Sequence, residues 1–265
     1  MCALFLAAQF NLLSAQTTVM KVWKGGNVTS SISTADVDSV TFETNKSGLD
    51  DGVYLINGHK FVDLGLPSGL LWAEANIGAE TAYDDGDYYA WGETSSKNEY
   101  TLDNYKHYTV DTIYNELYET YSYTEYYTKY NETDRKTVLD KEDDAAYVNW
   151  GASCRMPTYD EWCELTNSDN CIWVWVSRTN SSGEMINCYK VVSKKNNNII
   201  YLPASGYRYE SYLYNHGSLG SCWSSTLYSN YTSYACSLYF NSGGFGSDGD
   251  YRRYVGHTVR PVAAP

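Results

Sequence analysis

The chain is short of positive charge. Among its 265 residues, 19 are Lys or Arg and 32 are Asp or Glu, which gives a formal net charge of −13. A surface with so few cations repels phosphate backbones and anionic lipid headgroups. Nucleic acid is therefore excluded as an expected partner. Long apolar runs are also missing, so no transmembrane span is expected.

Regular cysteine spacing is absent too. The seven cysteines are an odd number at irregular intervals, and none forms the CxxC pattern typical of a metal site. A disulfide framework is therefore not predicted. Three connectivities are open if four of the cysteines pair among themselves, namely Cys154, Cys163, Cys171 and Cys188. Cys222 and Cys236 show no spacing that favours a bond between them.

The sequence lacks the short motifs that accompany common catalytic sites. It contains no glycine-rich nucleotide loop, no HExxH and no GxSxG. The four histidines are far apart in the chain. The adjacent carboxylates Asp143 and Asp144 fall at a predicted helix start, where the helix dipole explains them. The acidic run around Gly86 lacks EF-hand spacing and is interpreted as a solvated turn in preference to a calcium site. No enzymatic activity, cofactor or metal is expected.

Residues 1–16 form a short apolar run that ends in small residues. This pattern is typical of a secretory signal peptide cleaved near Ala15. A buried N-terminal strand or helix is the alternative. A basic segment before the run is missing, so the true start of the protein is expected to lie upstream of Met1. The signal peptide predicts a secreted or surface-displayed protein.

Residues 17–51 are predicted to form a small β segment and a linker. Two apolar runs in it, VMKVW and VDSVTF, are separated by a glycine turn. The main domain is predicted over residues 52–265, opening with a hairpin that turns at Asn57-Gly58. Within it, residues 98–130 are rich in Tyr and poor in aliphatic side chains. They are predicted to be a long surface insertion that is partly helical at best.

Two helices are predicted in the middle of this domain. The first covers Asp140–Trp150, with Asp140 as its N-cap and Gly151 as its stop. The second begins where Thr158 and Glu161 have the spacing of a capping box.

The second helix and the chain after it predict the fold class. Trp162 and Leu165 would share one face of that helix, three residues apart. Arg155 lies just before it, as a buried structural cation or, in the alternative, a binding residue. From Cys171 onward only strand and turn patterns remain. Strands, then helices, then strands predict an α+β fold and not repeated βαβ units.

The C-terminal tail, residues 206–261, has an unusual composition. Tyr, Ser and Gly dominate it, and Lys, Gln, Met and Ile are absent. Rigid amphipathic rings between small adaptable residues are typical of the contact surface of an antibody. An ordinary loop-rich β surface has a similar composition, which is the alternative interpretation.

Several segments in order carry a family resemblance. They include FVDLGLPSGLLWAEANIG, DYYAWGE, EDDAAYVNWG, RMPTYDEWCEL, YLPASGYR and GHTVRPV. Together they resemble the Fibrobacter succinogenes major paralogous domain family, over about residues 52–262. The resemblance implies a C-type-lectin-like fold in the form shared with formylglycine-generating enzymes. It would have two helices and a β-rich C-terminal half, preceded by the small β segment. It also implies a secreted or cell-surface protein of a Bacteroidetes-like bacterial envelope.

The tail itself resembles the variable proteins of diversity-generating retroelements. In those systems an error-prone reverse transcriptase rewrites the first two bases of AAC Asn codons, so Lys, Gln, Glu, Met and Trp cannot arise. The resemblance implies a set of ligand-binding residues between the fixed letters of the family pattern, and every member of the set is reachable from AAC. The set is Tyr209, Tyr214, His216, Leu219, Ser221, Cys222, Leu227, Tyr228, Tyr231, Ser233, Cys236, Tyr239, Phe245, Asp248, Asp250, Tyr251, Tyr254 and His257.

The remaining expectations concern scaffold and partners. The scaffold residues are Trp162, Arg155, Gly206, Trp223 and Arg260. The expected partner is a protein, a phage or host-surface ligand, or a glycan, and the oligomeric state is left open. One alternative is an undiversified cell-envelope or glycan-binding domain of the same fold. Another is an enzyme of the formylglycine-generating type, although Cys222 and Cys236 do not match its motif.

Overall fold

The computed structural model describes residues 19–24, 27–34 and 52–265. The chain divides into two units, Met1–Asn45 and Lys46–Pro265. The predicted signal peptide, residues 1–16, lies outside the described residues, as does most of the predicted linker. No helix within the described ranges is long and apolar enough to cross a membrane.

The first unit contains a two-stranded antiparallel sheet. Strand β1 (Val19–Lys24) pairs with β2 (Asn27–Ser33). The prediction of a strand over VMKVW is confirmed. The predicted partner run VDSVTF, residues 37–42, lies outside the described residues. The observed partner is NVTSSIS, in which the β-branched Val, Thr and Ile favour a strand.

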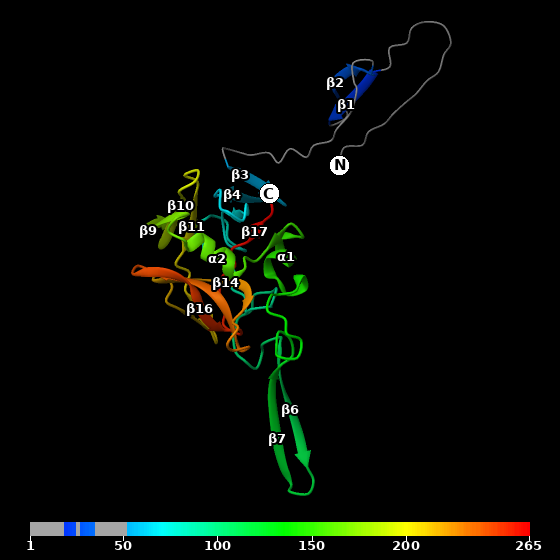
Figure 1. Cartoon of the computed structure of the whole chain (residues 1–265), viewed down its shortest axis with the longest axis vertical. Coiled ribbons are helices and arrows are strands. Elements are labelled where there is room, and N and C mark those ends of the chain that lie inside the picture. Colours follow the sequence, from blue (N-terminus) through cyan, green and yellow to red (C-terminus); the bar gives the residue numbers. More distant parts are fainter. Residues whose placement is uncertain (1–18, 25–26, 35–51) are drawn as a thin grey trace, which may run out of the picture. The chain divides into compact units, whose positions relative to one another are not determined.

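A five-stranded sheet joins the beginning and the end of the second unit (Figure 1). Its strands in spatial order are β3 (Val53–Ile56), β4 (His59–Asp63), β5 (Leu71–Ala73), β17 (Val262–Ala263) and β8 (Cys154–Arg155). Asn57 and Gly58 have φ values of 51° and 88°. A two-residue type I′ turn requires positive φ at both positions, so the predicted hairpin is confirmed. The C-terminal tail therefore leads directly into a strand held between β5 and β8.

The first predicted helix is shorter than expected. A 3₁₀ turn, η2 (Lys141–Asp143), is followed by α1 (Ala145–Trp150). The predicted N-cap, Asp140, is wrong. The carboxylate of Asp144 caps α1 by accepting the N–H groups of Ala146 and Tyr147, and it also accepts that of Met156. The last of these joins the cap to the residue that follows β8. Gly151 ends the helix with φ of 94°, as predicted.

The second predicted helix is confirmed as α2 (Tyr159–Thr166). The Thr158 hydroxyl accepts the Glu161 N–H, and the Glu161 carboxylate accepts the Thr158 N–H, which completes the capping box. Trp162 and Leu165 are both fully buried in one apolar cluster. The prediction that they share a face of the helix is confirmed.

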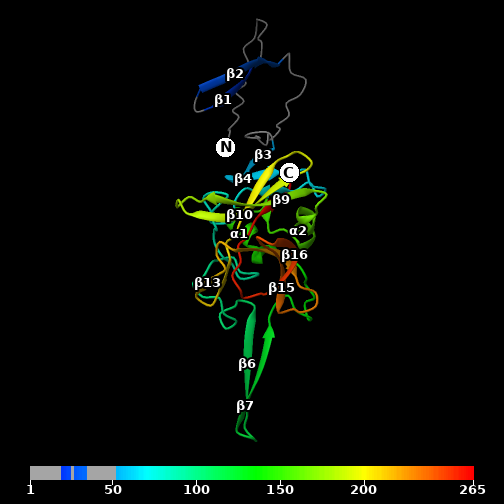
Figure 2. The same cartoon turned by 90° about the vertical axis from the view of Figure 1, so that its left-hand side faces the viewer.

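The C-terminal half consists of strands and turns, as predicted from Cys171 onward. A first sheet has the order β11-β10-β9, a short hairpin pairs β12 with β13, and a third sheet has the order β14-β15-β16 (Figures 1 and 2). The bounds are β9 Cys171–Thr179, β10 Met185–Ser193, β11 Ile199–Pro203, β12 Tyr207–Tyr209, β13 Tyr212–Tyr214, β14 Leu219–Leu227, β15 Tyr234–Asn241 and β16 Gly244–Arg252. With two α-helices and many strands, the chain belongs to the strand-rich α+β class.

Helix α2 lies against one face of the β14–β15–β16 sheet. Trp162 and Leu165 pack there with Cys222, Leu238 and Phe240. The indole N–H of Trp162 also donates to a β14 carbonyl, at 3.3 Å. Because one face of the sheet is occupied by α2, the residues that alternate with this set lie on the opposite face.

Gly220 of β14 is expected to tolerate no side chain. A Cβ at this position would overlap the ring of Phe240. Gly220→Ala is therefore expected to lower the free energy of unfolding by about 1–3 kcal/mol through overpacking. Urea unfolding measures the change. The control is Gly243→Ala, because the nearest atom to a Cβ there is Asn241 Oδ1 at 3.2 Å. If the two variants are equally stable, α2 does not pack on the sheet as described.

The structure corrects the prediction for the insertion, residues 98–130. Most of it is an antiparallel hairpin of β6 (Tyr108–Asn115) and β7 (Thr120–Tyr127), not helix. Tyr, Thr, Val and Ile make up most of both strands, and these residues suit a pleated strand better than a helix. The hairpin extends away from the rest of the unit (Figures 1 and 2).

Candidate ligand-binding face

The side of the β14–β15–β16 sheet opposite α2 carries small and aromatic residues of the tail. Ser221 lies opposite Tyr239, and Trp223 opposite Ser237. Ser237 in turn lies opposite Gly249. Residues directly opposite each other in a sheet point to the same side. The five residues therefore share one face, which alternates with the side chains that contact α2.

Small residues form the floor of this face. Ser221 and Ser237 are fully buried, and the Ser237 hydroxyl donates to the Gly249 carbonyl at 3.2 Å. A Cβ at Gly249 would lie 2.9 Å from a ring carbon of Tyr239. The Tyr239 ring consequently lies directly over Gly249, and any larger residue at that position would displace it.

Tyrosine rings surround the floor. The Tyr207 ring centroid lies 5.6 Å from that of Tyr214 and 5.8 Å from that of Tyr251. Tyr209 contacts Tyr214 as well, at 6.4 Å. We call the set Tyr207, Tyr209, Tyr214, Tyr239 and Tyr251 the tail face. All five side chains are at least partly exposed.

The β12–β13 hairpin holds part of the tail face in position. Tyr207 pairs with Tyr214 across it. Gly206 precedes the hairpin with φ of 66°, and a Cβ there would overlap the Tyr214 carbonyl. The Arg208 N–H donates to the Gly256 carbonyl at 2.8 Å and joins the hairpin to the last part of the tail. Gly206 therefore sets the path of the chain into this hairpin, and its scaffold role stays a prediction.

Two buried polar groups under the rings have no hydrogen-bond partner among the described residues. They are the Ser221 hydroxyl and both ring nitrogens of His257. The His257 ring lies 4.5 Å from Tyr251 and 4.3 Å from Trp223, centroid to centroid. Burial lowers the pKa of His257 to about 3, so the imidazole is neutral at physiological pH. A neutral imidazole and a hydroxyl each offer both a donor and an acceptor.

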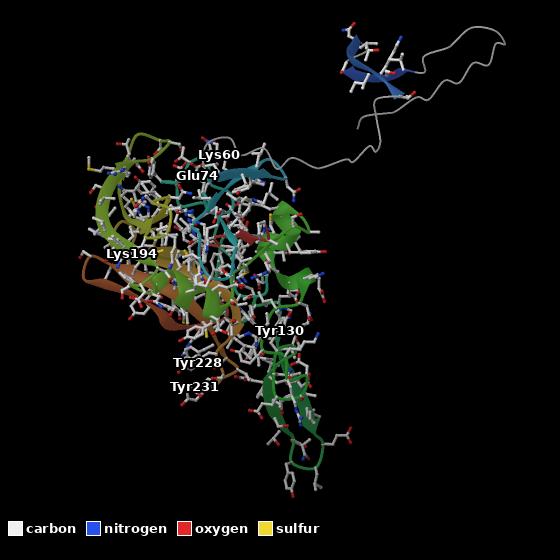
Figure 3. All side chains as sticks on the ribbon, turned by 45° about the horizontal axis from the view of Figure 1, so that its top comes forward. Lys60, Glu74, Tyr130, Lys194, Tyr228 and Tyr231 are labelled. Atoms are coloured by element: carbon white, nitrogen blue, oxygen red, sulfur yellow. The ribbon has the colours of Figure 1, made fainter. Side chains whose placement is uncertain are left out.

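A second tyrosine group lies at the β14–β15 connection. The ring centroids of Tyr228 and Tyr231 are 6.4 Å apart, and the two rings are stacked. Tyr231 is 64% exposed, and both labelled side chains extend outward from the ribbon (Figure 3). This pair adds exposed ring area to the tail.

The predicted ligand-binding residues divide into two groups. Ten side chains are exposed or partly exposed: Tyr209, Tyr214, His216, Leu219, Tyr228, Tyr231, Ser233, Tyr239, Phe245 and Tyr251. Of these, Phe245 lies apart from the tail face, because its ring stacks on Trp173 at 4.3 Å. The exposed His216 is held by Asp85, with 2.7 Å between Nε2 and Oδ2. The side chains of Asp248 and Asp250 lie outside the described set.

The other predicted residues are corrections, because the structure buries them. They are Ser221, Cys222, Leu227, Cys236, Tyr254 and His257. Cys222 packs under α2, and the Cys236 thiol is directed at the Leu227 carbonyl. These residues are at most 8% exposed, so they offer little or no surface to a partner. These residues pack in the protein interior, and they are left out of the candidate site.

The predicted scaffold residues Trp223 and Arg260 are fully buried. The Trp223 indole N–H donates to the Tyr89 carbonyl at 2.8 Å. Arg260 donates to the Asn76 side chain and to the Tyr201 carbonyl, each at 2.9 Å. Arg155 differs from them, since its side chain is 41% exposed and forms a two-pronged ion pair with Glu161. Arg155 is therefore a structural cation at the surface and not in the core.

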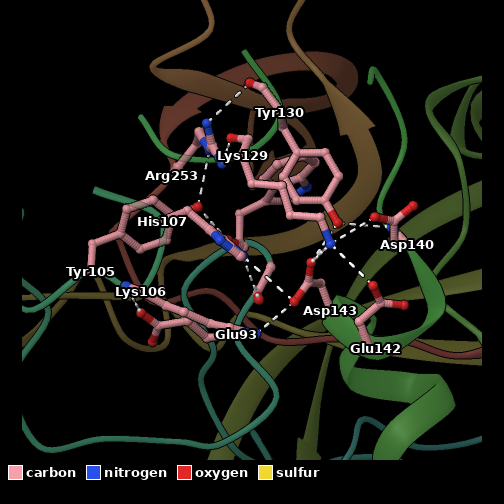
Figure 4. Close-up of polar contacts among 12 residues, drawn as sticks. Glu93, Tyr105, Lys106, His107, Lys129, Tyr130, Asp140, Glu142, Asp143 and Arg253 are labelled. Atoms are coloured by element: carbon pink, nitrogen blue, oxygen red, sulfur yellow. Dashed lines mark hydrogen bonds and ion pairs between the residues drawn. The ribbon is translucent and has the colours of Figure 1, made fainter. Parts of the chain in front are cut away.

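Sequence reasoning missed a further scaffold residue, Arg253. Its guanidinium is fully buried and lies 4.7 Å from the Tyr127 ring centroid and 5.0 Å from that of Trp91. It donates to the Tyr105 hydroxyl at 2.9 Å and to the Lys129 carbonyl at 2.9 Å (Figure 4). Arg253 therefore connects the tail to the base of the β6–β7 hairpin. The adjacent pair Arg252-Arg253 was the available signal.

A charged network lies beside Arg253 (Figure 4). Asp143 accepts hydrogen bonds from Lys106 at 2.6 Å, Lys129 at 2.5 Å and the Tyr130 hydroxyl at 2.6 Å. Burial alone would favour the protonated acid, but these donors lower the pKa of Asp143 to about 2. Burial lowers the pKa of the neighbouring His107 to about 4. The three donors flank the β6–β7 hairpin and Asp143 belongs to η2. Their hydrogen bonds therefore anchor the base of the hairpin to η2.

Three carboxylates of this network lie close enough to share a cation. In the part of the chain that the structure describes, Asp140, Glu142 and Asp143 are the only residues that bring three such ligand atoms within 4.8 Å of one another. The Lys129 ammonium lies among them, at 2.6, 3.2 and 2.5 Å. Lys129 offsets part of their negative charge, and Lys106 and Lys136 pair with Asp143 and Asp140. The Asp84–Asp87 turn forms no such cluster.

A cavity of about 730 Å³ opens beside α1, away from the tail face. Its lining includes Val138, Tyr147 and Arg155 but none of the tail-face tyrosines. The Asp144 carboxylate reaches it, yet that group already accepts the N–H groups at the start of α1. Lys141, Ser153 and Ser225 also line the cavity, but none of the predicted ligand-binding residues does, so it is not part of the candidate site.

Comparison with known proteins adds one match. The profile of a domain of unknown function, DUF8237, matches residues 191–262. This segment contains β11–β16 and the first residue of β17, and with them the whole of the tail. No curated protein matches the chain. No solved structure matches it either.

Proposed function

We propose that this protein is a secreted or surface-displayed ligand-binding protein, with a C-type-lectin-like domain whose tail face contacts the ligand. The observation that carries the proposal is the division of the tail into two kinds of residue. Exposed tyrosines gather on one surface, while Trp223, Arg253 and Arg260 are fully buried within the unit. Binding residues on a rigid frame are the usual arrangement in recognition domains.

The chemistry of the tail face suits partners of many shapes. A tyrosine ring offers a large contact area at little cost in side-chain entropy, and its hydroxyl bonds to polar groups. The five tyrosine side chains of the face are uncharged, so they do not themselves exclude a partner by its charge. A protein, a phage or host-surface ligand, or a glycan are all suitable targets.

Diversification by a retroelement is part of the proposal. The eighteen predicted ligand-binding residues are all reachable from an AAC codon. Ten of them have exposed or partly exposed side chains, where most substitutions leave folding unharmed. The DNA near the coding sequence tests this part. A near-repeat of the segment that encodes residues 207–261, differing where the template has adenine and lying beside a reverse-transcriptase gene, supports it. Absence of such a repeat leaves an undiversified binding domain of the same fold.

A displayed library tests the tail face directly. Positions 209, 214, 228, 231, 239 and 251 are randomised with the codons reachable from AAC, and the library is selected against hen lysozyme as a model target. We expect folded binders to emerge, because these side chains do not carry the core. A matched library at positions 222, 227, 236, 254 and 257 is expected to lose surface expression and to yield no binders. If both libraries behave alike, the tail face is not the binding surface.

A further inference from the structure

The β6–β7 hairpin carries most of its tyrosine on one face. Residues alternate between the two faces of a strand, and the pairing of Tyr114 with Tyr121 and of Thr112 with Tyr123 sets which residues share a face. One face, the arm face, contains Tyr108, Val110, Thr112, Tyr114, Tyr121, Tyr123, Glu125 and Tyr127. The opposite face contains Thr109, Asp111, Ile113, Asn115, Thr120, Ser122, Thr124 and Tyr126.

The arm face is open to solvent. Tyr114, Tyr121 and Tyr123 are 48%, 62% and 66% exposed. The ring centroids of Tyr114 and Tyr121 are 4.9 Å apart, so the two rings form a continuous surface. No other described segment pairs with either strand. Both outer edges of the hairpin therefore keep backbone donors and acceptors available to another chain.

The base of the hairpin is held firmly while its tip is free. Tyr108 and Tyr127 pack on the cluster around Tyr105, and the chain on either side of them is held by Arg253 and Asp143 (Figure 4). A two-stranded hairpin by itself is barely stable in water. Anchoring at the base alone leaves a long, presented surface, which is the arrangement of a docking arm.

Charge decides the kind of partner. Between Tyr108 and Tyr127 the chain contains Asp111, Glu116, Glu119 and Glu125, and no Lys or Arg. A second copy of the arm would bring two such sets of carboxylates together, which is unfavourable. Anionic lipid and nucleic acid are repelled in the same way. A positively charged polypeptide is the partner that complements the arm.

We propose that the arm face binds a basic, extended segment of another protein. The segment adds to an open edge of the hairpin, and its Lys or Arg side chains lie over the rings of Tyr114, Tyr121 and Tyr123. Cations over aromatic rings already occur within this protein, such as Arg208 over Tyr88 at 5.1 Å and Arg178 over Tyr201 at 5.3 Å. Backbone pairing provides affinity in this mode, and the side chains provide selectivity. The inference is independent of what the tail face binds.

A fluorescent peptide of alternating Arg and Thr tests the proposal with the full chain, by anisotropy. We expect this peptide to bind and a peptide of alternating Glu and Thr not to bind. Its affinity should fall as salt rises from about 50 to about 300 mM, because screening weakens exposed charge interactions. Equal binding of both peptides, or none of the Arg peptide, overturns the proposal.

Matched variants locate the site. Replacing Tyr114, Tyr121 and Tyr123 with Ser is expected to weaken binding about tenfold or more, since each exposed ring contributes about two- to fivefold. The same three positions changed to Phe should retain it, which separates lost rings from a lost hairpin. The control on the opposite face combines Thr109→Ser, Ile113→Ser and Thr124→Ser and should change the affinity less than about twofold. If the control weakens binding as much as the Ser variant, or if wild-type protein self-associates through the arm in sedimentation, the proposal is wrong.

Discussion

Replacing Arg260 with methionine is expected to lower the free energy of unfolding by about 4 kcal/mol or more. The guanidinium donates to the Asn76 side chain and to the carbonyls of Ala73, Glu74 and Tyr201, and it is fully buried. Methionine fills a similar volume but leaves these acceptors unsatisfied. Each buried acceptor without a partner costs about 1–3 kcal/mol. Chemical unfolding followed by tryptophan fluorescence measures the loss.

The control is Arg155→Met. The Arg155 guanidinium is partly exposed and is paired with Glu161 alone among the acidic groups. Ion pairs open to solvent contribute about 1 kcal/mol or less, so the same substitution should cost far less there. A loss at Arg260 no larger than at Arg155 would mean that the tail does not depend on this buried cation for its attachment to the core.

Acid is expected to destabilise the protein strongly between pH 7 and pH 5. Burial lowers the pKa of His257 to about 3 and that of His107 to about 4, against 6.5 for an exposed histidine. The unfolded chain therefore binds more protons than the folded chain below about pH 6.5. Stability falls as the pH decreases through this range and levels off only near the folded-state values. Each histidine should account for a loss of about 2 kcal/mol over these two pH units.

Single and double variants assign this loss. His257→Leu removes a titrating group and replaces two buried nitrogens that lack partners, so its acid loss should be about half that of the wild type. His107→Leu should remove the other half, and the double variant most of the total. Unfolding free energies at the two pH values measure the difference, which does not depend on how each substitution changes stability at pH 7. An unchanged difference in His257→Leu would show that this ring is not buried as described.

Local signals predicted the elements whose partners are close in sequence. Asn57-Gly58 requires only its own backbone angles to make a turn, and Thr158 and Glu161 cap a helix using each other. The N-cap of α1 was predicted wrongly because Asp140 precedes the separate turn η2, and α1 begins only after Asp144. The hairpin over residues 108–127 was not predicted. Its many Tyr and Thr residues indicated an exposed insertion, but the same residues also favour strands.

The candidate site was predictable only in part. Composition pointed to the tail, and the tail does carry the exposed tyrosines. Whether a given residue faces solvent depends on strand pairing. The set of residues reachable from an AAC codon contains no information on that pairing. Tyr239 and Cys222 are both reachable from one codon, yet the first lies on the tail face and the second under α2. Arg253 could not be assigned because its four ring partners come from three separate segments of the sequence.

The position of β17 has a consequence for synthesis. This strand follows all the others in the described chain, yet it lies between β5, which comes early in the domain, and β8. Contacts so distant in sequence form slowly, and only after the whole tail has been translated. A frameshift within the tail would remove Val262 and Ala263 and leave the central sheet open. Such a chain exposes unpaired strand edges to chaperones and proteases. The fold therefore favours chains whose tail is read in frame as far as β17.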